Sequence, residues 1–110
     1  MKKTGYILIV MLLSVAYGQV VYEVSQPVND AVKYTVTDWP NEADLWVFRV
    51  GTSAEVRDNQ GLWFFSPKPQ KAEKLVYKVA TPEEADLIIF FVDSPRRAGW
   101  KHFHKRGLMW

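Results

Sequence analysis

The sequence predicts a β-rich α+β domain, a compact repeat of short strands joined by one-turn helical caps. A phrase of the form V-x-x-x-P-x-x-A-D-L recurs about every 13 residues, most clearly in residues 36–45 and 79–87. Fainter copies begin at Val24, Phe65 and Val92. Each copy starts with turn-forming residues and ends in a run of β-branched and aromatic residues, which favours a turn followed by a strand.

The first 18 residues have the pattern of a signal peptide. Lys2 and Lys3 form a basic start, residues 5–15 are apolar, and small residues precede Gln19. The apolar run is shorter than the roughly 20 residues of a membrane-spanning helix. We therefore expect cleavage near Gly18 and export to the periplasm or the medium, with an uncleaved signal anchor as the alternative. Residues 19–110 are long enough for a single domain with one core.

The composition indicates that the stability of this domain comes from its packing. The chain has no cysteine, so no disulfide can form in an oxidising compartment. It has five tryptophans, all within residues 19–110, and large rings bury much apolar area in a small core.

The copy at residues 79–92 defines one unit of the repeat. Thr81 suits a helix N-cap, Pro82 suits the first helical position, and Glu84 completes a capping box. Only one helical turn fits, because the apolar residues 87–92 follow at once and predict a strand covered on both faces.

The remaining units follow the same plan with variations. Residues 46–50 predict the strand of the earlier clear copy, and residues 75–79 predict a strand covered on one face. The unit after Val50 is degenerate and predicts a longer polar loop, closed by a strand over residues 61–65. The connections are too short for ordinary βαβ crossovers, and the drifting spacing argues against an open solenoid.

Several phrases together resemble the septoil knot domain family of small bacterial proteins. They are the repeated V-x-S-x-x-x-A-D phrases, GLWFF at 61–65, ADLIIFFVDS at 85–94 and AGWK at 98–101. The resemblance covers about residues 21–110 and implies a compact domain with a deep seven-crossing knot in its backbone. It brings no established activity and no catalytic residues. The sequence departs from the family pattern in its degenerate third unit and in residues 101–105.

Recurring carboxylates are the first candidate site. Asp44 and Asp86 hold equivalent repeat positions, and Glu73 and Asp30 are their relatives in the fainter copies. Such carboxylates could gather around calcium. The favoured interpretation is structural, in which each accepts a backbone N–H bond where a turn becomes a strand.

Two histidines form the second candidate. His102 and His104 flank Phe103, and on a strand both imidazoles would point to one face. Two histidines can begin a zinc or copper site, but no third ligand is evident and basic neighbours repel a cation. We therefore interpret them as solvated side chains and expect no cofactor.

A basic C-terminal segment is the third candidate. No acidic residue follows Asp93, whereas five cations do, with Trp100 and Phe103 between them: Arg96, Arg97, Lys101, Lys105 and Arg106. This pattern is typical of a surface that binds nucleic acid, lipopolysaccharide or an acidic polysaccharide. The alternative is that the cations pair with the acidic remainder of the domain and that Trp100 belongs to the core.

No enzyme motif stands out. The chain lacks a cysteine nucleophile, a G-x-S-x-G elbow and a glycine-rich phosphate loop. The sequence thus predicts a non-enzymatic, exported structural or binding module, monomeric or weakly dimeric. A protein that binds an envelope polyanion is the first alternative, and a small carboxylate-dependent hydrolase is the second.

Overall fold

The computed structural model describes residues 19–56 and 58–110, so the expected signal peptide lies outside the described residues. Seven strands make up the fold. They are β1 (Gln19–Glu23), β2 (Val32–Val36), β3 (Leu45–Arg49), β4 (Leu62–Phe65), β5 (Lys74–Lys78), β6 (Leu87–Phe91) and β7 (Gly99–Trp100). In the part of the chain with described coordinates, no helix is long and apolar enough to cross a membrane.

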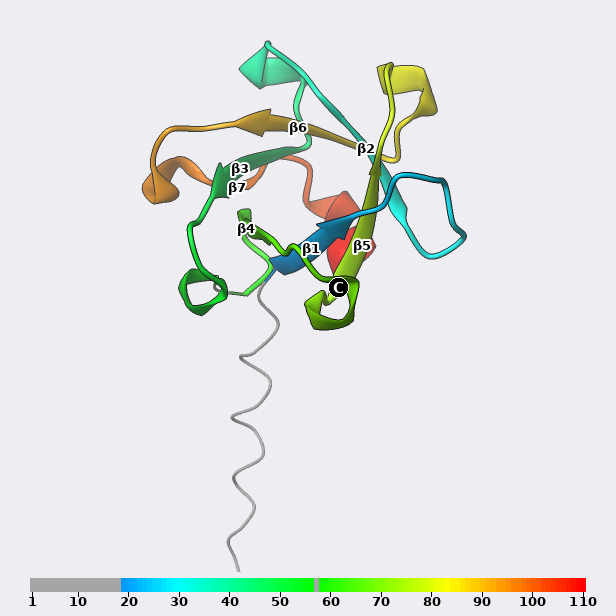
Figure 1. Cartoon of the computed structure of the whole chain (residues 1–110). Coiled ribbons are helices and arrows are strands. Elements are labelled where there is room, and N and C mark those ends of the chain that lie inside the picture. Colours follow the sequence, from blue (N-terminus) through cyan, green and yellow to red (C-terminus); the bar gives the residue numbers. More distant parts are fainter. Residues whose placement is uncertain (1–18, 57) are drawn as a thin grey trace, which may run out of the picture.

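Six of these strands close into a parallel barrel (Figure 1). Their order is β4-β1-β5-β2-β6-β3, and β3 pairs again with β4. The short β7 runs antiparallel to the start of β3, pairing Leu45 with Trp100, while β4 pairs with the end of β3 through Phe48 and Arg49. β7 and β4 therefore pair with opposite ends of β3.

The chain winds around the barrel twice. The first circuit is β1, β2 and β3, and the second is β4, β5 and β6. Each strand of the first circuit lies between two strands of the second, because β1 pairs with β4 and β5, β2 with β5 and β6, and β3 with β6 and β4. The strands of one circuit therefore do not pair with each other, which confirms that the fold is not a simple βαβ winding.

Single helical turns connect the strands from β2 to β7, as the repeat predicts, but they are 3-10 turns. Four of them place proline at the start of the turn: η2 (Pro40–Glu42), η4 (Pro69–Lys71), η5 (Pro82–Glu84) and η6 (Pro95–Arg97). Proline suits this position because its fixed φ matches the turn and its missing N–H is not needed there. These turns confirm the compact β-rich repeat.

The capping box predicted at Thr81 is wrong. The Thr81 hydroxyl does not cap the turn, and it donates instead to Glu84 Oε1 at 3.2 Å. The polar loop after β3 contains the better example, in η3 (Ser53–Glu55). There Glu55 Oε1 accepts the backbone N–H groups of Gly51 and Thr52 at 2.9 and 3.0 Å. The degenerate unit of the repeat has therefore kept its turn.

The hydrophobic core fills the barrel. Its fully buried side chains alternate along the strands and come from both circuits: Val21, Leu45, Val47, Trp63, Val76, Leu87 and Ile89. The prediction that residues 87–92 are covered on both faces is wrong, because a barrel strand turns only one face inward. The outward Ile88 and Phe90 are half-buried, and Trp46 packs on Phe90 with ring centroids 5.7 Å apart.

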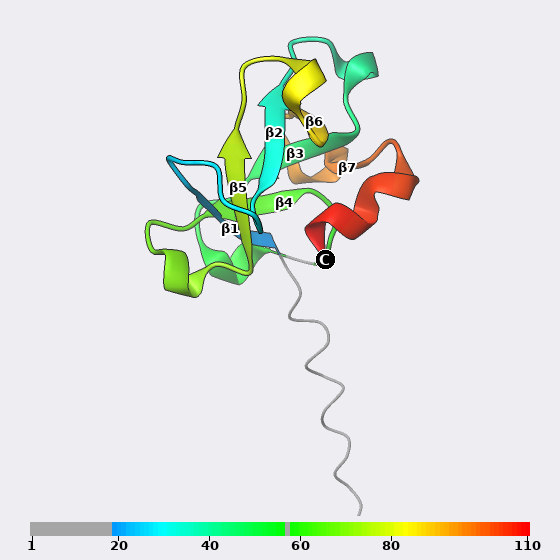
Figure 2. The same ribbon diagram turned by 90° about the vertical axis from the view of Figure 1, so that its right-hand side faces the viewer.

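A final 3-10 segment, η7 (Phe103–Met109), lies against the side of the barrel near β4 and β7 (Figure 2). Met109 is buried, and its carbonyl oxygen accepts a hydrogen bond from Gln19 Nε2 at 3.0 Å. The Asn59 amide donates to the Arg106 carbonyl at 2.9 Å. These contacts fix the basic C-terminal segment onto the domain.

Candidate functional site

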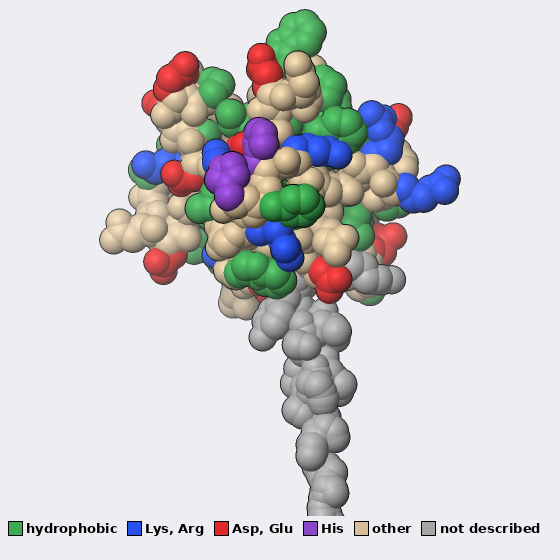
Figure 3. Space-filling model, turned by 180° about the vertical axis from the view of Figure 1, so that it is seen from behind, with side chains coloured by type: hydrophobic (Ala, Val, Ile, Leu, Met, Phe, Trp, Pro, Cys, Tyr) green, Lys and Arg blue, Asp and Glu red, His purple; other side chains and the backbone are tan. Residues whose placement is uncertain are grey.

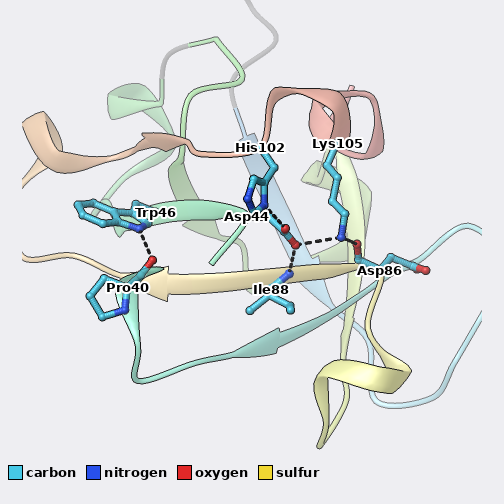
Figure 4. A network of polar contacts seen from close by, with 7 residues as sticks. All are labelled: Pro40, Asp44, Trp46, Asp86, Ile88, His102 and Lys105. Carbon is cyan, nitrogen blue, oxygen red and sulfur yellow. Dashed lines mark hydrogen bonds and ion pairs between the residues drawn. The ribbon is translucent and has the colours of Figure 1, made fainter. Parts of the chain in front are cut away.

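The candidate site is built around Asp44, the aspartate of the repeat phrase at the start of β3 (Figure 4). Its side chain is only 5% exposed. Oδ1 lies 2.7 Å from His102 Nδ1, and Oδ2 accepts hydrogen bonds from the Ile88 N–H at 2.8 Å and from Lys105 Nζ at 3.1 Å. A largely buried carboxylate thus joins β6 to the C-terminal segment.

Asp44 is held as a carboxylate. Burial acts to raise its pKa, because a low dielectric disfavours the charged form. The hydrogen bonds from His102, Ile88 and Lys105 act in the opposite direction and outweigh burial, so the pKa of Asp44 is lowered overall. The site therefore carries a fixed negative charge beside two basic side chains.

The three repeat carboxylates perform the same structural task. Asp86 Oδ2 accepts the Lys33 N–H at 3.2 Å, and Glu73 Oε1 accepts the Val20 N–H at 3.4 Å. The backbone N–H of each acidic residue in turn donates to the carbonyl of the same residue on the neighbouring strand, as Asp44 does to Ile88 at 2.7 Å. This confirms the structural interpretation of these carboxylates.

The acidic residues are spread over separate turns of the barrel. Within residues 19–56 and 58–110, no three histidine, cysteine, aspartate or glutamate side chains converge as a metal-ligand set. The arrangement therefore does not favour the calcium hypothesis.

The two histidines lie at the start of η7 and not on a strand, so the alternation of a strand does not place their imidazoles. His102 follows β7, and its side chain is 48% exposed. His104 lies in η7 with its ring centroid 5.9 Å from that of His102. The backbone N–H groups of Lys101 and His102 both donate to the Asp44 carbonyl, at 2.8 and 3.1 Å, so Asp44 anchors this segment through main chain and side chain.

Sequence reasoning missed the contact between Asp44 and His102. The two residues are 58 positions apart, and Asp44 looks equivalent to Asp86 in the repeat. Only pairing of β7 with β3 brings them together. The single sequence signal was the departure from the family pattern at residues 101–105.

The five basic residues have different environments. Arg97 forms an ion pair with Asp93 at 3.0 Å, and Lys105 pairs with Asp44. Lys101 Nζ lies 4.1 Å from the centre of the Trp46 ring, and Arg97 lies over the same ring at 5.5 Å. Arg106 lies 5.7 Å from the Trp110 ring centre, and Arg96 belongs to η6.

A cleft of about 460 Å³ opens between the β7–η7 segment and the loop before β4. Two of the basic residues line it together with amide and aromatic side chains: Asn59, Gln60, Ala98, Gly99, Trp100, Lys101, Phe103 and Arg106. None of these eight lining residues is acidic. Phe103 is 68% exposed, whereas Trp100 is buried and donates from Nε1 to the Asn59 carbonyl at 2.9 Å. Trp100 therefore belongs to the core, as its repeat position indicated.

The fold and this site define a class of protein, a small parallel barrel wound twice by a chain with capped turns, bearing a basic and aromatic C-terminal face. Residues 18–101 match the model of the 7(1) septoil knot domain, and the chain belongs to that family. The family description names a topology and no activity. No curated protein and no solved structure matches the chain.

Part of the candidate site follows the residues of the family match. His102, Phe103, His104, Lys105 and Arg106 all follow residue 101. Asp44, Asn59 and Trp100 lie within the matched residues. The site thus combines residues within the family match with residues that follow it.

Proposed function

We propose that this protein is a binding module that holds polyanions on its C-terminal face. The cleft lined by Lys101, Phe103 and Arg106 is the observation that carries the proposal. Cations attract the charged groups of a polyanion, and an exposed aromatic ring adds contact area for planar or sugar rings. The absence of acidic residues from the cleft lining favours an anionic ligand over a cationic one.

The cations differ in their availability to such a ligand. Lys105 forms an ion pair with Asp44, and Arg97 forms one with Asp93. Lys101 and Arg106 line the cleft, and their charged groups lie near aromatic rings and not beside a carboxylate of the described part of the chain. Lys101 and Arg106 are therefore the main ligand-binding residues of the proposal, with Arg96, Arg97 and Lys105 contributing to the positive field around them.

A charge-removal experiment tests this function. Lys101→Gln with Arg106→Gln should weaken binding to a sulfated polysaccharide about tenfold or more and reduce the salt dependence by a slope of about 2. The matched control is Lys71→Gln with Lys78→Gln, which removes two charges from η4 and β5. Equal binding by both double variants would refute the proposal and leave the structural module as the better interpretation.

The proposal includes export after removal of residues 1–18. Its support is the basic and then apolar pattern of the first 18 residues and the start of the family match at residue 18. Expression in a bacterium, followed by N-terminal sequencing, should give a chain that begins at Gln19 in the periplasmic or secreted fraction. A chain that starts at Met1 in the cell membrane would favour the uncleaved anchor.

The proposal also includes the seven-crossing knot. Its support is the family description and the interleaving of the two circuits of strands. A chain that must be threaded before its strands can pair unfolds slowly, which gives kinetic stability outside the cell. Rapid proteolysis of the folded protein under native conditions would contradict this part of the account.

A further inference from the structure

We propose that His102 and His104 form a binding site for a divalent transition-metal ion and that Asp44 positions His102 within it. The proposal is independent of polyanion binding. It rests on three observations: the contact between Asp44 and His102, the spacing of the two imidazole rings, and the pairing of the nearest ammonium group.

Asp44 fixes both the orientation and the tautomer of His102. The carboxylate is itself held by Ile88 and Lys105, so it cannot follow a rotating imidazole. Because a carboxylate only accepts hydrogen bonds, His102 Nδ1 carries a proton and donates it across 2.7 Å. In the neutral ring the lone pair is then on Nε2, at the far side of a side chain that is 48% exposed. Metal-binding histidines commonly show this carboxylate contact.

His104 is placed to supply a second nitrogen. Its ring centroid is 5.9 Å from that of His102, and the ring planes differ by 40°. A metal–nitrogen bond of about 2.0 Å puts each ring centroid about 3 Å from the ion, so two ligating rings lie at most about 6 Å apart. Figure 3 shows the two histidine side chains next to each other on an open face of the molecule.

The charges near the rings are less repulsive than the sequence indicates. Lys105 Nζ donates to Asp44 Oδ2 at 3.1 Å and to the Asp86 carbonyl at 3.2 Å, so its ammonium is paired. Lys101 places its ammonium over the Trp46 ring. Asp44 adds a negative charge directly behind His102, which strengthens the imidazole as a ligand.

The donor set determines the class of metal. Two imidazole nitrogens suit Cu²⁺, Ni²⁺ and Zn²⁺, and divalent ions bind nitrogen sites most tightly at copper. Calcium and magnesium prefer oxygen ligands and are not expected here. Water would complete the coordination, so the ion would remain accessible to a further ligand.

Titration of the purified protein with Cu²⁺ and Zn²⁺, followed by calorimetry, tests the site. We expect one ion per chain, with Cu²⁺ bound more tightly than Zn²⁺. His102→Ala and His104→Ala should each weaken binding at least tenfold, and Asp44→Asn should weaken it about 10-fold to 100-fold. The matched control is Asp86→Asn, which alters an equivalent repeat carboxylate that contacts Lys33, and it should leave metal binding unchanged.

A second measurement does not depend on the folding of the Asp44 variant. Imidazole ¹⁵N spectra of the wild type should show zinc on Nε2 of His102 while Nδ1 keeps its proton. Zinc on Nδ1 of His102, or undiminished affinity in the His102→Ala/His104→Ala double variant, would overturn the proposal.

Discussion

At the residue scale, the side chain of Asp44 makes more contacts than those of Asp86 and Glu73, its equivalents in the repeat. Asp44, Asp86 and Glu73 all accept a backbone N–H bond from a neighbouring strand. Only Asp44 among these three also contacts the side chains of His102 and Lys105. The shared backbone role could be predicted from the repeat, because equivalent positions in a repeat have equivalent geometry. The side-chain contacts could not, because they depend on a segment 58 positions away.

This difference predicts unequal costs for the same substitution. Asp44→Asn should reduce the free energy of unfolding by about 2 kcal/mol, because a largely buried carboxylate loses its charge beside Lys105 and His102. Asp86→Asn should cost less than about 1 kcal/mol, because it affects one exposed hydrogen bond. Urea denaturation of both variants measures the costs. Equal losses would show that the C-terminal contacts of Asp44 contribute nothing to stability.

The lowered pKa of Asp44 predicts a loss of stability in acid. Folding holds the pKa of Asp44 below its ordinary value of 3.8, so its contribution is complete above that value and disappears as the pH falls through the folded pKa. Urea denaturation between about pH 5 and about pH 2 should therefore show a steeper loss for the wild type than for Asp44→Asn. Burial raises the pKa of Glu73, which works in the opposite direction and is common to both proteins. Parallel curves would contradict the assignment.

At the element scale, the sequence predicts the turns and strands of the repeat better than the hydrogen bonds that cap a turn or the C-terminal segment η7. Proline-led turns followed by β-branched and aromatic runs identified β3, β5 and β6, because both signals are local. The capping box at Thr81 was wrong because the Thr81 hydroxyl bonds to the Glu84 carboxylate and not to the backbone of the turn. Segment η7 was not predicted as a helix, since its stability comes from contacts of Met109, Arg106 and His102 with other elements.

One glycine is required where β4 meets β3. Gly61 has a φ of +92°, and a Cβ atom there would lie 2.4 Å from the Trp46 carbonyl oxygen. Gly61→Ala should therefore reduce the free energy of unfolding by about 3 kcal/mol through backbone strain and overlap. Gly107→Ala is the matched control, since a Cβ there meets nothing within 4 Å, and it should change stability by less than about 1 kcal/mol. Thermal denaturation compares the two variants. If Gly61→Ala leaves the stability unchanged, the backbone where β4 meets β3 can shift to make room for a Cβ atom.

At the scale of the whole molecule, the twofold winding is the feature that local sequence signals could not reveal. Repeated short units predict strands but do not say which strands pair. A solenoid would pair strands of successive units, whereas here β1 pairs with β4 and β5. The family resemblance, which drew on about residues 21–110, supplied the expectation of a knot, which periodicity could not.

Mechanical extension tests the knot directly. An unknotted chain reaches at most about 3.6 Å per residue when it is pulled by its ends. Pulling the folded protein at Gln19 and Trp110 should give a final extension shorter than this limit for residues 19–110, because a tightened knot retains part of the chain. Extension to the full limit would exclude a knotted backbone.

The central functional claim is that the basic, aromatic C-terminal face receives a polyanion. Backbone amide shifts recorded during titration with a sulfated oligosaccharide test it most directly. The account predicts that the largest changes fall on residues 98–106 together with Asn59 and Gln60, and that they diminish as salt is added. Changes centred instead on the lysines of η4 and β5, or no saturable changes anywhere, would contradict it.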